Sequence, residues 1–308
     1  MKLLRRVALA GSVLFAAFIA VQFPYATDAP LTSAEVAKSA AFYQQAYAAP
    51  AEAPAADEDL YVQAATAAAE GWHIKDRLTE FAAAQHLESR RVLEVGSGRG
   101  YLQDVVTDYT GLDISPSVKR FYHKPFILGS ATSLPFQDNS YDALWSIWVI
   151  EHVPNPEQAF REMRRVVKND GLLYLFPAWS CKPWAADGYD VRPYSDFDPG
   201  GMLIKMSIPL RNNNLYQAAY TAPIRTLRWL SYATLRGPTT LHYHRLTPNY
   251  DKFWEGDGDA VNSLDRYEAL LWFLSRGDEC LNCTAPSLFR AIAEHVTDPR
   301  LIIRVHKS

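Results

Sequence analysis

The sequence has few cysteines, no excess of charge of one sign and one long hydrophobic run. Its 308 residues contain three cysteines, an odd number that is too small for a disulfide framework in a chain of this length. The 31 basic and 34 acidic residues leave a net charge of -3, so no overall positive field attracts a nucleic-acid backbone. We therefore expect no nucleic acid among the partners of this protein.

The hydrophobic run lies near the amino terminus. Residues 7–23, VALAGSVLFAAFIAVQF, carry no charge and follow Lys2, Arg5 and Arg6. A basic segment before an apolar run of this length is typical of a membrane anchor or of a secretory signal. We expect residues 1–23 to be one of the two, and we favour the uncleaved anchor because the following FPYATDAP has no clear A-x-A cleavage motif.

The remainder divides into a linker and one large domain. Residues 24–59 are rich in Ala and Pro and predict a spacer with one short helix at SAEVAKSAAFYQQAYA, for which Ser33 is the candidate cap. An amphipathic pattern over residues 60–87 leads into a folded domain that we expect to cover residues 60–308. With 48% hydrophobic residues, this length suffices for a sizeable core.

A β-rich run followed by glycines opens this domain. RVLEV at residues 91–95 predicts a strand, and GSGRG follows it with Gly96, Gly98 and Gly100. A strand, such a loop and then YLQDVV are typical of the first β-loop-α unit of an open parallel sheet. Glycine is needed there because a nucleoside must approach the backbone closely.

Two carboxylates accompany the glycines. Glu94 lies at the carboxyl end of the first strand, and Asp113 ends the next apolar run, YTGLDIS. Both therefore lie at the edge of the sheet where ligands bind in doubly wound folds, and a carboxylate there can accept both hydrogens of a ribose diol. The glycine spacing disfavours a dinucleotide, since Tyr101 stands where G-x-G-x-x-G needs its last glycine.

The motifs VLEVGSGRGYL and GLDISPS, and the segment from LPFQDNSYDALWSIWVIEHV to VVKNDGLLYLF, resemble a known family. They are similar to the class I methyltransferases that use S-adenosylmethionine, in particular the small-molecule branch called methyltransferase type 11. The resemblance covers residues 90–177 and, less clearly, 264–308. It implies a doubly wound, Rossmann-like α/β fold whose seven-stranded sheet is mainly parallel, with an antiparallel last strand and a large insertion after strand 5.

The resemblance also implies a cofactor and the residues that hold it. Glu94 would support the methionine end indirectly, Asp113 would hold the ribose, and Ile114 would pack on the adenine. Ser130 stands where the family usually has an acidic residue that accepts from the adenine amino group, so its hydroxyl would have to replace a carboxylate. The full predicted set is Glu94, Gly96, Ser97, Gly98, Gly100, Tyr101, Asp113, Ile114, Ser130, Ala131 and Thr132.

His152 is the candidate catalytic base. It follows the apolar strand ALWSIWVI within the family's common EH signature, and an imidazole titrates near the working pH. A histidine that only shapes the cofactor pocket is the alternative. The next segment, NPEQAFREMRRVV, predicts a helix capped by Asn155, with Arg161, Arg164 and Arg165 on a solvated face.

The substrate is expected to bind at an aromatic insertion over residues 178–263. Aromatic rings suit sugar faces, flat aglycones or lipid headgroups. Asp257 and Asp259 suggest a polar face toward the substrate, but H-x-H and D-x-D pairs supply only part of a coordination sphere, so we expect no metal. The basic segment TAPIRTLRWLSYATLRG reads either as a packed amphipathic helix or as a membrane-surface helix.

Cys280 and Cys283 form a C-x-x-C on a predicted strand, where the two side chains would point to opposite faces. We therefore expect two buried structural thiols. In the same segment Asn282 matches a glycosylation pattern, but we expect the strand to exclude modification.

The sequence thus predicts a methyltransferase that uses S-adenosylmethionine for O-methylation of a small or carbohydrate-like acceptor. Methylation of a membrane quinone or lipid is the first alternative, and a non-catalytic S-adenosylmethionine-binding protein is the second. We expect a catalytic domain that faces the cytoplasm, where this cofactor is made, with membrane association through residues 7–23. The charge bias of Lys2, Arg5 and Arg6 favours the opposite side, so an exported form stays open, as does the oligomeric state.

Overall fold

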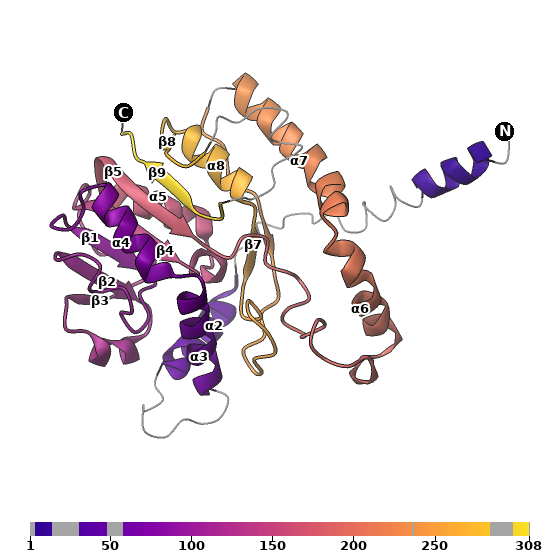
Figure 1. Cartoon of the computed structure of the whole chain (residues 1–308), viewed down its shortest axis with the longest axis horizontal. Coiled ribbons are helices and arrows are strands. Elements are labelled where there is room, and N and C mark those ends of the chain that lie inside the picture. Colours follow the sequence, from indigo (N-terminus) through magenta and orange to yellow (C-terminus); the bar gives the residue numbers. More distant parts are fainter. Residues whose placement is uncertain (1–3, 14–30, 48–57, 236, 284–297, 308) are drawn as a thin grey trace.

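Seven strands form one sheet, which lies on the side of the molecule away from the helix of residues 4–13 (Figure 1). The computed structural model describes residues 4–13, 31–47, 58–235, 237–283 and 298–307. Along the sheet the strand order is β3-β2-β1-β4-β5-β9-β8. The strands are β1 (Val92–Val95), β2 (Tyr109–Asp113), β3 (Phe126–Leu128), β4 (Tyr141–Ile147), β5 (Val167–Phe176), β8 (Glu279–Cys280) and β9 (Leu301–Arg304).

The strand directions confirm the predicted fold class. The pairs β1–β2, β2–β3, β1–β4 and β4–β5 are all parallel. Strand β9 runs antiparallel to both β5 and β8, with Leu173 opposite Ile303 and Cys280 opposite the same residue. The sheet is therefore seven-stranded and mainly parallel, and its last strand in the chain is the antiparallel one.

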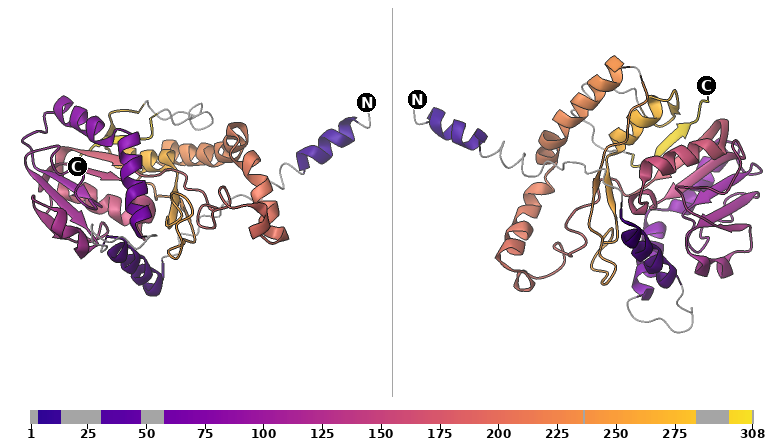
Figure 2. Two further views of the ribbon diagram at one scale, coloured as in Figure 1. Left: turned by 60° about the horizontal axis from the view of Figure 1, so that its bottom comes forward. Right: turned by 180° about the vertical axis from the view of Figure 1, so that it is seen from behind.

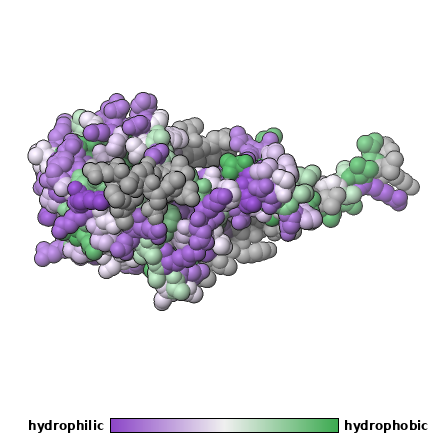
Figure 3. Space-filling model, turned by 90° about the horizontal axis from the view of Figure 1, so that it is seen from below, coloured by the Kyte–Doolittle hydropathy of each residue, from purple (hydrophilic) through white to green (hydrophobic). Residues whose placement is uncertain are grey.

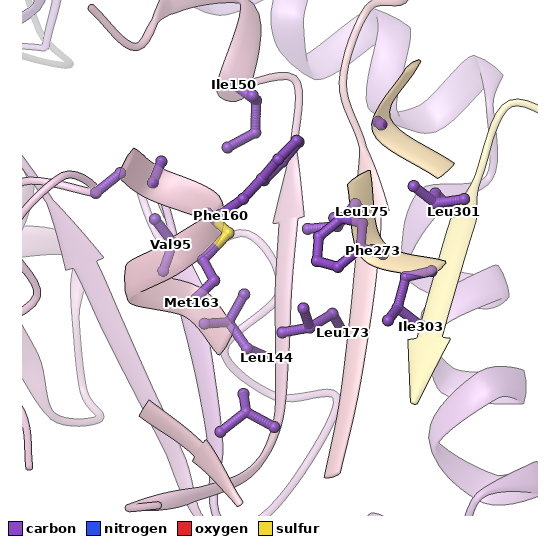
Figure 4. Packing of buried hydrophobic residues seen from close by; sticks show 14 of the residues in the cluster. Val95, Leu144, Ile150, Phe160, Met163, Leu173, Leu175, Phe273, Leu301 and Ile303 are labelled. Carbon is purple, nitrogen blue, oxygen red and sulfur yellow. The ribbon is translucent and has the colours of Figure 1, made fainter. Parts of the chain in front are cut away.

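Helices cover both faces of the sheet, which is why its strands read as nearly continuous apolar runs. The helices are α2 (Ser33–Ala46), α3 (Glu58–Gly71), α4 (Ile74–Ala84), α5 (Pro156–Val166), α6 (Pro199–Arg211), α7 (Asn214–Leu235) and α8 (Arg266–Leu274), with 3₁₀ turns η1 (Pro116–Phe121), η2 (Ile150–His152) and η3 (Tyr194–Asp196). On one face, Leu144 and Leu173 pack against Phe160 and Met163 of α5 and Phe273 of α8 (Figure 4). On the other face, α4 packs against the alternate residues of the same strands.

Helix α5 begins as its sequence predicts. The Asn155 side chain accepts a hydrogen bond from the backbone N–H of Gln158 at 3.0 Å. Its arginines are not simply a solvated face, however. Arg164 pairs with the buried carboxylate of Asp278 at 2.8 Å and donates to the carbonyl of His306, so it ties α5 to the last strand of the sheet.

The segment after the glycine loop differs from the predicted β-loop-α unit. Residues 99–107 form successive turns rather than an α-helix, and β2 follows them directly. Leu102 and Val106 are nevertheless buried against α4, so the apolar spacing that suggested a helix reflects packing of a turn segment instead.

The insertion separates β5 from α8. It contains α6 and α7, which extend away from the sheet (Figure 2), and a hairpin of β6 (Tyr243–Arg245) and β7 (Asn262–Leu264). The basic residues of α7 do not form an outer face: Arg225 pairs with Asp265 and Arg228 with Glu268 across to α8, both at 2.8 Å. This pairing agrees with the packed-helix interpretation of the segment, and the membrane-surface alternative stays a prediction.

The amino-terminal prediction is only partly covered by the described residues. Residues 4–13 form a helix with exposed side chains, whereas residues 14–23 lie outside the described ranges. Within those ranges, no helix is long and apolar enough to span a membrane. Figure 3 shows hydrophilic and hydrophobic residues intermingled over one face of the molecule. The interpretation of residues 1–23 as an anchor or a signal stays a prediction.

The expectation of two separate thiols was wrong, because Cys280 and Cys283 form a disulfide. Strand β8 ends at Cys280, and the following turn brings Cys283 back to a Cα–Cα distance of 5.4 Å. Within that turn, Asn282 donates to Asp298 and to the carbonyl of Arg300. The alternation of a regular strand therefore does not apply to these two cysteines.

Candidate active site

An open cavity of about 1780 Å³ lies at the carboxyl ends of β1, β2 and β4. Its walls also come from α2, from the segment after β5, from the α6–α7 connection and from the β6–β7 hairpin. Pockets for a single drug-sized ligand hold about 300–1,000 Å³. This cavity therefore has room for two ligands side by side.

The glycine loop forms the rim of the cavity next to β1. Gly96, Gly98 and Gly100 all have positive φ values, of 74°, 48° and 73°, a region in which a side chain is strained. At Gly96 there is no space either, since a Cβ would lie 2.2 Å from Val149 Cγ2. Gly96 itself lines the cavity, so the sequence needs glycine there for both backbone and packing reasons.

Asp113 ends β2 and lies beside this loop. One carboxylate oxygen accepts from the backbone N–H of Gly98 and the other from that of Ser115, each at 2.9 Å. Burial raises the pKa of Asp113, and the two backbone donors act against this effect. Each carboxylate oxygen can accept further hydrogen bonds, and Asp113 lines the cavity. The two oxygens are therefore available to the hydroxyls of a diol.

Glu94 lies beneath the loop rather than in the cavity wall. The hydroxyl of Tyr109 donates to Glu94 Oε2 at 2.5 Å. Burial raises the pKa of the Glu94 carboxyl to about 8, so the group is largely protonated at neutral pH. This position fits a residue that acts on the site through its neighbours.

The end of β2 and the loop after β3 form the next wall. Ile114 is 41% exposed and lines the cavity, where it offers an apolar shelf. The hydroxyl of Ser130 contacts Thr132 Oγ1 at 2.9 Å and accepts from the Thr132 backbone N–H. If the Ser130 hydroxyl donates to Thr132, it keeps one lone pair for an amino group.

The structure brings together only part of the predicted cofactor set. The predicted residues that line the cavity are Gly96, Asp113, Ile114, Ser130 and Ala131. The others, Glu94, Ser97, Gly98, Gly100, Tyr101 and Thr132, lie behind or beside the wall. Gly98 and Thr132 still contribute, through their hydrogen bonds to Asp113 and Ser130, and the set as a whole stays a prediction.

His152 lies in the same cavity, after β4, among carboxylates. Its Nδ1 is 3.4 Å from Asp259 Oδ2, and its Nε2 is 3.8 Å from Glu151 Oε1. Asp257 also lines the cavity at this point. The sequence prediction that Asp257 and Asp259 face the substrate region thus agrees with the geometry.

These charges shift the titration of the histidine. Burial lowers the pKa of His152, but Asp259, Glu151 and Asp257 together act against burial, and the net result is a raised pKa. Burial also raises the pKa of Glu151 to about 7. The carboxylates around His152 therefore favour its protonated form, and an imidazole in such a setting is a candidate for proton transfer.

Helix α2 supplies a functional contact that the sequence did not reveal. The hydroxyl of Tyr43 donates to Asp259 Oδ2 at 2.8 Å, and its ring lies edge-on to His152 with centroids 5.8 Å apart. Tyr47 reaches the glycine loop, where its hydroxyl lies 3.3 Å from the position of a Cβ on Gly98. The segment expected to be a spacer therefore closes one side of the site, and the only hint was its pair of tyrosines.

Among the described residues, no group of three His, Cys, Asp or Glu side chains is arranged to hold a metal ion. Cys181, which is buried nearby, donates to the carbonyl of Ala178, and burial raises the pKa of its thiol. The thiol therefore stays protonated.

Comparison with known proteins agrees with this geometry. A family model described as "Methyltransferase domain" matches residues 93–175. A protein described as an uncharacterized methyltransferase, from Mycobacterium tuberculosis (strain ATCC 25177 / H37Ra), is 37% identical over 102 residues, which cover 29% of this chain and 40% of that protein. A similarly described protein from Mycolicibacterium paratuberculosis is 37% identical over 111 residues, 31% of this chain and 44% of that protein. The chain thus spans less than half the length of these curated relatives.

Solved structures of similar proteins match only part of the fold. A putative methyltransferase from Bacillus halodurans C-125 is 20% identical and has a TM-score of 0.34, covering 38% of this chain and 59% of that chain. The YcgJ protein from Bacillus subtilis is 18% identical with a TM-score of 0.35, covering 63% and 65%. These superpositions cover too little of the fold to define it, and the fold is assigned from the strand order of the sheet.

Proposed function

We propose that the whole chain transfers the methyl group of S-adenosylmethionine to an oxygen of a small, carbohydrate-like acceptor, since residues 93–175 match a methyltransferase domain and belong to a class I sheet. The observation that carries the proposal is Asp113. Its carboxylate, fixed by two backbone N–H groups, borders a cavity large enough for two ligands.

The residues around Asp113 fit the cofactor. Asp113 would bind the two ribose hydroxyls, Gly96 would let the nucleoside approach the backbone, and Ile114 would contact the adenine ring. Ser130 would accept from the adenine amino group in place of the usual acid. S-adenosylmethionine supplies an electrophilic methyl group on a sulfonium, and the protein must hold the acceptor in line with it and exclude water.

His152 is the group that we assign to proton removal. A hydroxyl acceptor has a high pKa and needs a base as it attacks. The neutral imidazole would take this proton, and Asp259 would stabilise the resulting imidazolium at 3.4 Å from Nδ1. Tyr43 holds Asp259 in place through its hydrogen bond and therefore acts as a positioning residue.

The acceptor class follows from the remaining walls. Trp148, Trp179 and Phe176 provide flat apolar faces, and Asp257 provides a hydrogen-bond acceptor close to His152. Aromatic faces with a carboxylate are the groups that bind a sugar ring with its hydroxyls. The alternative acceptor, a membrane quinone or lipid, gains no support from the basic residues of α7. Arg225 and Arg228 form ion pairs within the protein.

A screen with radiolabelled S-adenosylmethionine tests the proposal. The native chain should label hydroxyl-bearing acceptors, the label should resist alkaline hydrolysis as a methyl ether does, and tandem mass spectrometry should place the methyl group on a hydroxyl oxygen. Labelling confined to amines or thiols would reject the O-directed assignment. Cofactor binding without any transfer, over a broad acceptor panel, would favour the non-catalytic binding protein.

Membrane attachment through residues 7–23 is part of the same proposal. The expected result is that the full chain sediments with vesicles while a chain lacking residues 1–30 does not. Protease protection of the carboxyl terminus in sealed vesicles would then show which side the catalytic domain faces.

A further inference from the structure

One cation in the cavity wall differs from the others in its surroundings. Arg211 is the last residue of α6 and lines the cavity. Its Nε is shielded from solvent, and among the described residues it has no hydrogen-bond partner and no carboxylate within ion-pair distance of its guanidinium. Burial accordingly lowers the pKa of this side chain.

The other cations that line the cavity each have a polar partner for their terminal nitrogens, although the Nε of Arg245 is shielded like that of Arg211. Arg225 pairs with Asp265, and Arg245 donates to Asn262 and to the carbonyl of Pro154. Lys182 pairs with Asp190 at 3.3 Å. Arg211 is partly buried, and withdrawing part of a charge from water without a carboxylate beside it is costly, so the placement of Arg211 requires a reason.

Arg211 also contacts an aromatic ring. Its guanidinium lies over the ring of Trp184, with Cζ 4.3 Å from the ring centroid. The Trp184 indole N–H donates to Asp190 at 3.2 Å, which holds the ring in turn. Stacking occupies the face of a guanidinium but leaves the N–H groups at its edges free for a bidentate contact with a carboxylate or phosphate.

A purely structural role does not account for these features. A basic residue at the end of α6 favours the helix dipole, but this effect needs only an exposed charge. It requires neither burial of Nε nor stacking on Trp184.

We propose that Arg211 binds an anionic group, a carboxylate or a phosphate, on the methyl acceptor. This inference rests on the proposed function, because it assigns one end of the acceptor to Arg211 and leaves the hydroxyl end for His152. The acceptor class is thereby narrowed from a neutral sugar to a sugar acid, a sugar phosphate or a similar hydroxylated anion. The tyrosines beside Arg211, Tyr216 and Tyr220, line the same part of the cavity.

The test is a titration of the full chain with inorganic phosphate, with acetate and with neutral acetamide, followed through the indole N–H resonances of the tryptophans. Phosphate or acetate should shift the resonance assigned to Trp184 saturably, and acetamide should not. A response to phosphate alone indicates a phosphorylated acceptor, and a response to acetate indicates a carboxylate. Arg211→Gln should lower the affinity for the anion by about tenfold or more, as expected for a lost charge-assisted hydrogen bond.

Arg161→Gln is the matched control, since Arg161 lies on α5, pairs with Glu157 and is outside the cavity. It should bind the anions as the native chain does. Equal anion binding by Arg211→Gln and the native chain, or no anion binding by the native chain, would overturn the inference. Binding of S-adenosylhomocysteine to the native chain is measured in parallel. If the native chain does not bind S-adenosylhomocysteine, the proposed function is rejected instead.

Discussion

The hydroxyl of Tyr43 donates to Asp259 at 2.8 Å, although the two residues are 216 positions apart in the sequence. The same carboxylate oxygen lies 3.4 Å from Nδ1 of His152. A helix before the sheet and a turn in the insertion therefore meet at the candidate base. This contact makes the environment of His152 dependent on residues outside the segment that matches the methyltransferase family.

Tyr43→Phe is expected to move the pH dependence of turnover. Without the hydrogen bond, the charge of Asp259 is less neutralised and stabilises the protonated His152 more strongly. The pKa of the base rises, so the acid limb of the kcat profile should shift to higher pH. Tyr47→Phe alters the same helix near Gly98 rather than near Asp259, and an equal shift in that variant would contradict the assignment.

His152→Ala should lower turnover by about 10²–10⁴-fold, the usual contribution of a general base. In the native chain, activity should rise with pH through a value above about 6.5, the ordinary pKa of histidine, because the pKa of His152 is raised. The variant should lack this limb.

His244 offers a control for that experiment. It lines the same cavity, and burial lowers its pKa to about 4, so it stays neutral across the range of the assay. His244→Ala should keep the acid limb of the native chain. If the limb survives in His152→Ala and disappears in His244→Ala, the base has been assigned to the wrong histidine.

Glu94→Gln should make stability less dependent on pH. Burial raises the pKa of Glu94 from 4.5 to about 8, so the folded state binds more protons than the unfolded state between these values. Stability of the native chain should therefore fall as pH rises through this window, while the uncharged amide of the variant escapes that loss. Urea unfolding at pH 5 and pH 8 measures the difference, and identical pH dependence in both chains would show that Glu94 titrates normally.

Gly96→Ala should destabilise the fold more than Gly277→Ala. Both glycines have a positive φ, but a Cβ at Gly277 meets nothing within 4 Å, whereas one at Gly96 meets Val149. The expected cost is about 1–2 kcal/mol for the backbone alone at Gly277, with a further 1–3 kcal/mol or so from overpacking at Gly96. Equal costs, measured by urea unfolding, would mean that Val149 moves away freely.

Much of the sheet was predictable, because its strands are short apolar runs with acidic or glycine residues at fixed places. The sequence pattern correctly predicts the ends of the strands that contain Glu94 and Asp113, and it correctly predicts Asn155 as the cap of α5. The turns over residues 99–107 were not predictable, since buried Leu102 and Val106 produce the spacing of a helix without forming one.

The candidate site was predictable only where local motifs define it. Asp113 and His152 follow strands whose ends must meet at one edge of the sheet. The contact of Tyr43 with Asp259 joins two segments without a shared motif, and the ion pair of Arg228 with Glu268 joins α7 of the insertion to α8. Pairings of this kind depend on tertiary packing, which hydrophobic periodicity does not encode.

Asp113 is expected to anchor S-adenosylmethionine through its ribose. Calorimetric titration of the full chain with S-adenosylhomocysteine tests it most directly, since this product keeps the ribose and needs no acceptor. Binding to the native chain and a loss of about tenfold or more in Asp113→Ala, as expected for hydrogen bonds to a charged group, are the predicted results. No binding to the native chain, or equal binding to the folded variant, would contradict the account.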